Sequence, residues 1–438
     1  MAFRSADLIE VWAWGRLVGA TVQDPQSGFY VFEYDEEWVR SGADLAPLHL
    51  PRQPGTFVFP DLAPATFLRL PALLADSLPD RFGNALVDAW MARQGVSREE
   101  ITPLDRLAYL ADRAMGALEF RPPADVEVAD IAAVQLADLV AAARQAVSGD
   151  FGDDDAALDA LRQLVQVGTS AGGARAKAVI AYNPNTKQIR SGQMAAPDGF
   201  EQWLVKLDGV SAADPTREDL EFGVGAGYGH VELAYHLMAT AAGVEMEACQ
   251  LLPEGPRTHF LTRRFDRGPG GVRHHVLSLC AMAHLDFNMG RTHGYEQYLA
   301  TVDELGLGAD ARQQAFRRAV FNVAAVNRDD HTKNLAFVLP HDGAGWQLAP
   351  AYDLTHAHNP EDGKWTPSHQ MSVGGRFDGI SRTDLTDLAD LFAVPDHRGV
   401  IRDVLDAVDR WEEFAAAADV TVEHRDRIRA DMDRFRPT

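Results

Sequence analysis

The chain has 438 residues, which at roughly 100–200 residues per domain predicts two or three domains. Hydrophobic residues make up 46% and charged residues 24%, which is typical of a globular protein and excludes a disordered or collagen-like chain. The net charge of −23 argues against whole-surface binding to nucleic acid or anionic lipid.

The cysteines and the apolar segments indicate the compartment. With only two cysteines, Cys249 and Cys280, neither a disulfide framework nor a multi-cysteine zinc site is expected. The first residues lack the basic start and long apolar stretch of a signal peptide. No segment approaches the roughly 20 apolar residues that a membrane helix requires. We therefore expect a cytoplasmic protein with no membrane partner.

The first third of the chain is predicted to be rich in β-structure. Three short runs rich in Val, Trp, Phe and Tyr between Leu8 and Tyr34 predict an antiparallel meander. Recurring prolines between Pro47 and Pro71 favour an extended surface segment. Helical spacing follows at Phe82, Leu86 and Trp90, and the Arg-Pro-Pro run at 121–123 is a plausible domain boundary.

The rest of the chain changes from mixed elements to helices. Residues 131–147 carry a helical apolar face, while 178–183 and 203–207 read as strands. Beyond residue 230 the pattern is mostly amphipathic helix, interrupted by a hairpin predicted over 335–349. The expected fold class is α+β, with a β-rich N-terminal part in two subdomains and a helical C-terminal lobe. The predicted domains are 1–123, 124–265 and 266–438.

A group of polar residues near position 330 carries the sharpest chemical signal. Asp329 precedes Asn334 by five positions between a predicted helix and a predicted strand. In a kinase catalytic loop the equivalent Asp accepts a hydroxyl proton and the Asn binds magnesium. The hairpin then returns the chain to Asp353, which could hold the same metal through hard oxygen ligands. A solvated turn in which Asp or Asn caps an element explains the spacing equally well.

Two upstream features suit phosphate binding. The small-residue loop 168–177 ends in Lys177 and lacks side chains that would keep its backbone amides from a phosphate. Lys206 is a lone cation in an apolar strand, as is the lysine that pairs with phosphates in kinases. A plain tight turn and a lysine on the wet face of an edge strand are the alternatives. Glycine loop, strand lysine, catalytic loop and distal Asp nevertheless follow the order that phosphoryl transfer needs.

Other patterns are rejected as sites. The glycines at 223–229 lack the third glycine of a dinucleotide loop. The pairs His274–His275 and His356-x-His358 have no HExxH frame, so zinc is not expected at either. Five arginines between 425 and 436 are interleaved with acids, which favours a salt-bridged helix face over a nucleic-acid patch.

Taken together, the motifs resemble the HipA serine/threonine kinases, the toxin members of bacterial type II toxin–antitoxin pairs. The resemblance covers nearly the whole chain. It is carried by Phe32–Asp35 with Trp38, Leu78–Asp80 with Gly83–Asn84, Gly116–Phe120, the loop ending in Lys177, Arg264–Arg267, Asp329–Asn334, Tyr352–Asp353 and Met371–Gly375.

The resemblance implies a protein-kinase-like fold with ATP between two lobes. Asp329 would be the catalytic base, and Asn334 and Asp353 the Mg²⁺ ligands. The ATP-binding residues would be Ser170, Ala171, Gly172, Gly173, Ala174, Lys177, Lys206, Arg263, Phe265, His331 and Lys333. Ser170 matches a loop serine that such kinases phosphorylate on themselves, and the added charge of about −2 would compete with ATP.

The leading interpretation is an ATP- and Mg²⁺-dependent protein kinase that arrests growth by phosphorylating a translation enzyme. By resemblance the target is an aminoacyl-tRNA synthetase, the partner is a HipB-like helix-turn-helix antitoxin, and DNA is contacted only through that partner. One alternative is a weakly catalytic or non-catalytic corepressor of the antitoxin, which the acidic charge permits. Another is a small-molecule kinase, against which the β-rich first 125 residues weigh.

Overall fold

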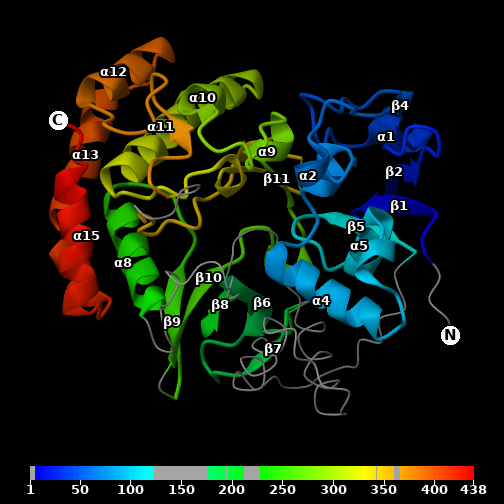
Figure 1. Cartoon of the computed structure of the whole chain (residues 1–438), viewed down its shortest axis with the longest axis horizontal. Helices are drawn as coiled ribbons and strands as arrows, with labels where there is room; N and C mark the ends of the chain where they lie inside the picture. Colours follow the sequence, from blue (N-terminus) through cyan, green and yellow to red (C-terminus); the bar gives the residue numbers. More distant parts are fainter. Residues whose placement is uncertain are drawn as a thin grey trace.

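A computed structural model describes residues 5–122, 175–192, 196–211, 227–255, 257–341, 343–359 and 366–438. The first subdomain, on the right in Figure 1, holds a five-stranded antiparallel sheet in the order β4-β3-β2-β1-β5. Its strands are β1 (Leu8–Ala13), β2 (Arg16–Gln23), β3 (Tyr30–Tyr34), β4 (Thr56–Phe57) and β5 (Leu118–Arg121). In β1 the alternate residues Ile9, Val11 and Ala13 are buried, as expected for a half-buried strand.

Short helices cover this sheet and connect it to the rest of the molecule. They are α1 (Glu36–Ser41), α2 (Pro64–Phe67), α3 (Ala72–Ala75), α4 (Arg81–Ala92) and α5 (Pro103–Leu110), with the 3₁₀ helix η1 (Arg98–Glu100). The meander and the helix around Leu86 are confirmed. The prediction of an extended surface segment over Pro47–Pro71 is wrong in part, because Leu50, Leu62 and Phe67 are buried. Apolar residues between the prolines pack into the core there.

A second antiparallel sheet forms a small lobe. Its order is β7-β6-β8-β10-β9. The strands are β6 (Arg175–Tyr182), β7 (Ile189–Ser191), β8 (Glu201–Ser211), β9 (Cys249–Glu254) and β10 (Arg257–Arg263), and α8 (Tyr228–Ala241) packs against β9 and β10. Because β8 lies between β6 and β10, Lys206 belongs to a central strand and the edge-strand alternative is wrong.

The C-terminal lobe, on the left in Figure 1, is mainly helical. Its helices are α9 (Leu279–Met282), α10 (Tyr295–Glu304), α11 (Gly308–Ala324), α12 (Arg382–Leu391), α13 (His397–Asp409), α14 (Trp411–Ala417) and α15 (Val422–Arg434), with the 3₁₀ helices η3 (Pro269–Gly271) and η4 (Thr332–Asn334). The small strands are β11 (His275–Ser278), β12 (His293–Gly294), β13 (Ala336–Leu339), β14 (Gln347–Leu348) and β15 (Met371–Ser372). Strands β13 and β14 form the predicted hairpin.

The α+β, protein-kinase-like architecture predicted from the sequence is confirmed. One buried cluster runs from Ile9 and Phe32 in the first sheet to Tyr295 and Phe316 in the helical lobe, so these parts share a core. The helix predicted over 131–147 lies outside the described residues, as does the first predicted domain limit; the domain limits stay predictions. None of the described helices combines the length and the apolar composition of a membrane span.

A buried histidine at the junction of the first subdomain and the C-terminal lobe gives the stability a pH dependence. The Nε2 atom of His275 donates to the Leu45 carbonyl at 3.0 Å, and the residue is 1% exposed. Burial lowers the pKa of His275 from 6.5 to about 4, and the hydrogen bond to Leu45 only partly opposes this. Below pH 6.5 the unfolded chain therefore binds a proton that the folded chain does not.

The free energy of unfolding is therefore expected to fall by about 3 kcal/mol from this residue as the pH drops from 6.5 to 4. Urea unfolding at several pH values would measure it. His275→Gln should flatten this part of the profile, and replacing the exposed His341 with Gln should not. The same slope in the His275 variant and the wild type would contradict the prediction.

Candidate active site

The loop after α11 is anchored by a buried carboxylate. Asp330 has no exposed side-chain surface. It accepts hydrogen bonds from the Tyr295 hydroxyl at 2.8 Å, the His369 Nδ1 atom at 3.0 Å and the Gln370 backbone N–H at 2.7 Å. These donors come from α10 and from the segment before β15, so a fully paired buried charge fixes the loop to two other parts of the lobe.

The two catalytic-loop residues predicted from the sequence lie together beside this anchor. The Asn334 side-chain amide donates to the Asp329 carbonyl at 2.8 Å, and the amide oxygen lies on the other side of the same group. The Asp329 side chain is 46% exposed, and its Oδ1 atom lies 3.7 Å from the His331 Nε2 atom. The loop thus carries one half-exposed carboxylate and, next to it, one amide oxygen.

Lys206 joins the small lobe to the C-terminal lobe. Its Nζ atom pairs with Glu232 of α8 and lies 2.5 Å from the Asp353 Oδ1 atom. The Nζ atom of Lys177 lies 3.5 Å from the other oxygen of Asp353. Lys177 and Lys206 are directly opposite on β6 and β8. Two like charges so placed repel each other; Asp353, which contacts both, and Glu232, which pairs with Lys206, offset that repulsion.

The charges of this cluster reinforce one another. Burial alone would raise the pKa of Asp353, but the Lys177 and Lys206 ammonium groups override it and hold that pKa well below its usual range. Burial would likewise lower the pKa of Lys206, and the charges of Asp353 and Glu232 keep it above its ordinary value. Both groups are therefore ionised at neutral pH.

Asp329 has a different electrostatic environment. Partial burial of its carboxylate raises the pKa of Asp329, the negative charges of Asp353 and Asp330 add to this shift, and His331 and Lys177 oppose it. A carboxylate with a raised pKa binds a proton more readily than an ordinary aspartate, which suits a general base.

A small pocket opens beside the cluster, between the second sheet and the segment that carries Asp353. It is lined by Glu232, Met246, Cys249, Phe260, Thr262, Tyr352, Asp353 and Leu354. The Tyr352 hydroxyl donates to the Lys333 carbonyl at 2.8 Å, and its ring stacks on Phe265 with centroids 5.9 Å apart. Phe265 thus packs against the Tyr352 ring at the junction between the lobes.

The structure brings some predicted residues together and not others. Lys177, Lys206 and Asp353 form one cluster, and Asp329 and Asn334 lie on one loop with His331. The Lys333 ammonium lies over the Phe287 ring at 5.4 Å. The half-exposed Arg263 side chain does not reach the cluster, because its guanidinium pairs with Glu247 at 2.7 Å. The predicted loop residues Ser170, Ala171, Gly172, Gly173 and Ala174 lie outside the described residues.

Sequence reasoning missed Glu232 and Asp330. Glu232 is 3% exposed on α8, among the buried residues Val231, Ala234 and Tyr235. A lone acid on the apolar face of a helix is the signal that could have found it, because a buried charge needs a partner. Asp330 offered no such signal, since it reads as the second acid of an exposed turn.

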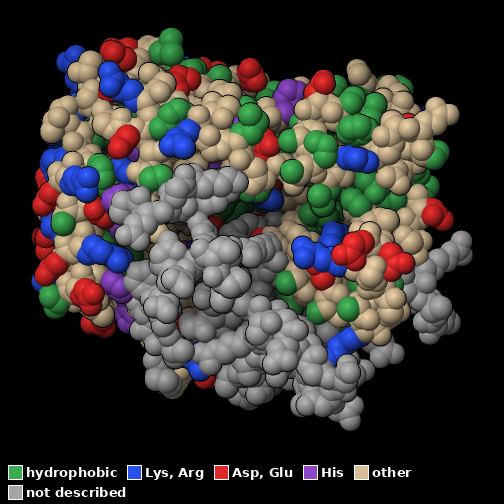
Figure 2. All heavy atoms as spheres, viewed as in Figure 1, with side chains coloured by type: hydrophobic (Ala, Val, Ile, Leu, Met, Phe, Trp, Pro, Cys, Tyr) green, Lys and Arg blue, Asp and Glu red, His purple; other side chains and the backbone are tan. Residues whose placement is uncertain are grey.

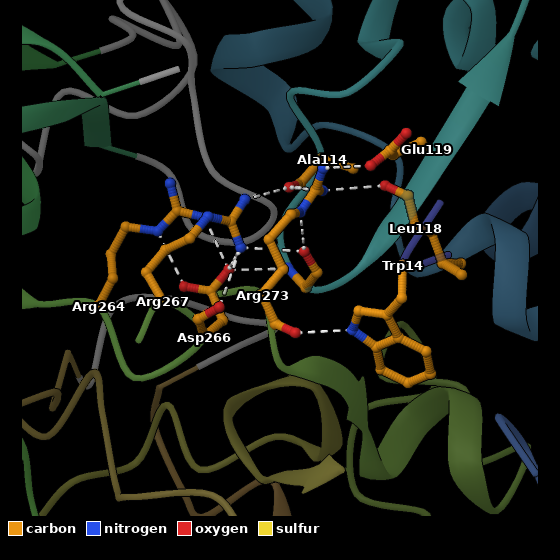
Figure 3. A network of polar contacts seen from close by, with 9 residues as sticks. Trp14, Ala114, Leu118, Glu119, Arg264, Asp266, Arg267 and Arg273 are labelled. Carbon is orange, nitrogen blue, oxygen red and sulfur yellow. Dashed lines mark hydrogen bonds and ion pairs between the residues drawn. The ribbon is translucent and has the colours of Figure 1, made fainter. Parts of the chain in front are cut away.

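A second buried network links the first subdomain to the segment between β10 and β11 (Figure 3). Asp266 is completely buried. Its carboxylate accepts hydrogen bonds from Arg264 Nε at 2.9 Å, from Arg264 Nη2 at 2.7 Å and from Arg267 Nη1 at 2.7 Å. It also accepts the Gly116 N–H at 2.8 Å. Burial would raise the pKa of Asp266, but Arg264 and Arg267 hold it well below its usual range.

Arg273 extends this network to β5 and to the turn that follows β1. It donates to the Gly116 carbonyl at 3.0 Å and to the Leu118 carbonyl at 3.0 Å, and its own carbonyl accepts the Trp14 indole N–H at 2.8 Å. The Arg264–Arg267 and Gly116–Phe120 motifs are therefore a structural junction between two parts of the molecule.

Comparisons with known proteins agree with this architecture. The family model described as the HipA N-terminal domain matches residues 9–121, and the HipA-like C-terminal domain matches residues 169–417. A chain from the Shewanella oneidensis MR-1 complex of HipA, HipB and operator DNA matches in fold, with 16% identity and a TM-score of 0.63 over 98% of this chain and 97% of that one.

A Helicobacter pylori proinflammatory kinase, CtkA, aligns weakly, with 10% identity and a TM-score of 0.28 over 50% of this chain and 91% of that one. No curated protein matches the sequence significantly. Since one family model alone covers residues 169–417, more than half of the 438 residues, the chain belongs to the HipA-like family.

Proposed function

We propose that the protein is an ATP- and Mg²⁺-dependent serine/threonine protein kinase. The observation that carries the proposal is the Lys206 ammonium, which contacts both Glu232 and Asp353 between the two lobes. A lysine–glutamate pair on a strand and a helix, next to a metal-binding Asp, is the arrangement that protein kinases need for phosphoryl transfer. Asp329 and Asn334 lie on the loop that supplies the base in such enzymes.

Each residue then has a defined task. Asp329 accepts the proton of the attacking hydroxyl, helped by its raised pKa. Lys206 and Lys177 offer two ammonium groups to the phosphates, held in position by Asp353. Asn334 and Asp353 fit Mg²⁺, since they supply an amide oxygen and an ionised carboxylate, the hard donors that this ion prefers. Bound Mg²⁺ would neutralise charge on the transferring phosphoryl group.

Family membership supports a role as the toxin of a toxin–antitoxin pair. We propose a HipB-like antitoxin as partner, because a similar fold is found in the Shewanella complex of HipA, HipB and operator DNA. The net charge of −23 disfavours direct DNA binding. On the face shown in Figure 2, described Lys and Arg side chains lie among Asp and Glu without a continuous basic surface. The proposed substrate is an aminoacyl-tRNA synthetase, with autophosphorylation at Ser170.

Replacing Lys206 with Gln tests the proposal. We expect kcat/KM for ATP to fall roughly 10- to 100-fold, since a hydrogen bond to a charged group contributes about 1.5–3 kcal/mol. The variant also leaves Glu232 and Asp353 without the cation between them. Phosphate transfer from labelled ATP to a bacterial extract, with magnesium, would measure the effect.

Lys187→Gln is the matched control, because Lys187 is exposed at the turn between β6 and β7 of the same sheet. It should transfer phosphate like the wild type. Equal activity of the Lys206 and Lys187 variants would overturn the proposal. Label found only on small metabolites would assign the same site to a small-molecule kinase.

A further inference from the structure

Two histidines and an aspartate converge on the far side of the C-terminal lobe from the first subdomain. His356 and His358 follow Asp353 in the chain, and Asp431 comes from α15. The Asp431 Oδ2 atom lies 2.9 Å from His356 Nε2 and 3.0 Å from His358 Nδ1. All three potential ligand atoms lie within 4.8 Å of one another.

The backbone between the histidines holds both rings in place. Ala357 donates its N–H to the Val326 carbonyl at 3.2 Å and accepts the Arg328 N–H at 3.1 Å, which forms a parallel bridge beside Asn327. In an extended segment, residues i and i+2 point to the same side, so His356 and His358 face α15 together. The Phe435 ring meets His358 edge-on at 4.9 Å and fixes its orientation.

We propose that His356, His358 and Asp431 bind one divalent transition-metal ion, with Zn²⁺ as the first candidate. Two imidazoles and one carboxylate are a recurrent three-ligand set for such ions, and the fourth position can hold water. Ligand atoms about 2.0–2.1 Å from a common ion are roughly 2.9–3.4 Å apart, depending on the angle between them. The two N–O separations of 2.9 and 3.0 Å fall within this range.

The burial of the side chains supports a built site. The two histidine side chains are each 6% exposed and the Asp431 side chain 17%, so the ligand atoms are held in place by packing and the carboxylate is the most exposed of the three. The charges of Arg427 and Arg328 act on this cluster and weaken cation binding. The carboxylate of Asp431, which contacts both histidines, compensates for part of that repulsion.

A bound ion would connect three parts of the lobe. It would join α15 to the segment that follows Asp353, and this segment pairs through Ala357 with the residues directly before Asp329. The Arg328 guanidinium lies 3.9 Å over the same Phe435 ring that orients His358. The site therefore lies outside the phosphoryl-transfer cluster, and a bound ion would stabilise the position of the residues directly before Asp329.

Zn²⁺ binding to the full chain tests the proposal. After removal of metals with a chelator, titration calorimetry should show one Zn²⁺ per chain, and Zn²⁺ should raise the midpoint of thermal unfolding. We expect Asp431→Asn to weaken Zn²⁺ binding at least tenfold. The matched control is Asp426→Asn on the same helix, where Asp426 is exposed and pairs with Arg425; it should bind like the wild type.

His358→Gln is a second variant that removes a different ligand, and it decides the question if the Asp431 variant does not fold. Weakening in both variants but not in the control supports the site. No stoichiometric Zn²⁺ uptake by the wild type would overturn the proposal and leave a doubly hydrogen-bonded carboxylate. Equal affinity in the ligand variants and the control would also overturn it, by assigning the ion to other histidines.

Discussion

Asp329→Asn is expected to lower the rate of phosphoryl transfer by at least about 100-fold, the smallest contribution usual for a general base. The amide keeps the shape of the side chain and loses its ability to accept a proton. The hydrogen bond from Asn334 goes to the backbone carbonyl of Asp329 and not to its side chain. The substitution leaves this bond in place, so the loop should keep its conformation. Initial rates with labelled ATP and protein substrate would measure the loss, and circular dichroism would check the fold.

Asp387→Asn is a suitable control, since Asp387 is exposed on α12 in the same lobe. Its rate should equal that of the wild type. Full turnover by the Asp329 variant would remove the base from the proposed mechanism. If the Asp329 variant lost both its activity and its circular dichroism signal, its unfolding would be compared with that of Asp330→Asn, which removes the buried carboxylate that anchors the loop.

The second large effect is on stability. Asp266→Ala is expected to lower the free energy of unfolding by about 3–5 kcal/mol, the cost of removing one partner from a buried ion pair. The change leaves Arg264 and Arg267 without their carboxylate and the Gly116 N–H without its acceptor. Urea unfolding of the full chain at neutral pH would measure the difference.

Glu119→Gln provides the comparison within the same network. The Glu119 side chain is 21% exposed and contacts Arg273 at 3.4 Å, so its loss should cost less than about 1 kcal/mol. If both variants lost the same small amount of unfolding free energy, the network around Asp266 would not join the first subdomain to the kinase lobe as described. A selective loss of the first subdomain, seen as early proteolysis near residue 121, would support the junction.

Local chemistry explains why part of the site was predicted. Asp329, Asn334 and Lys206 lie in short segments whose order and spacing phosphoryl transfer constrains, so they were recognisable without a fold. Lys206 points into the cluster, as the kinase hypothesis required. The hairpin that brings Asp353 back was also predictable, because its turn composition is local.

What the sequence could not give is contact between distant elements. Glu232 lies 26 positions from Lys206, and the Asp330 donors come from residues 35 to 40 positions away. The zinc exclusion at His356 and His358 considered only a local motif, whereas Asp431 lies 75 positions beyond His356. Resemblance assigned Arg263 to the nucleotide; its guanidinium pairs with Glu247, and this assignment stays a prediction.

The sharing of Asp353 by two lysines affects how the lobes are held. Lys177 and Lys206 belong to the small lobe and Asp353 to the C-terminal lobe, so one carboxylate attracts both ammonium groups across the interface between the lobes. All three groups are at least four-fifths buried, which shields them from dissolved ions. Ordinary changes of ionic strength should therefore leave the lobe orientation unaltered, whereas loss of the Asp353 charge would release both ammonium groups and weaken the contact between the lobes.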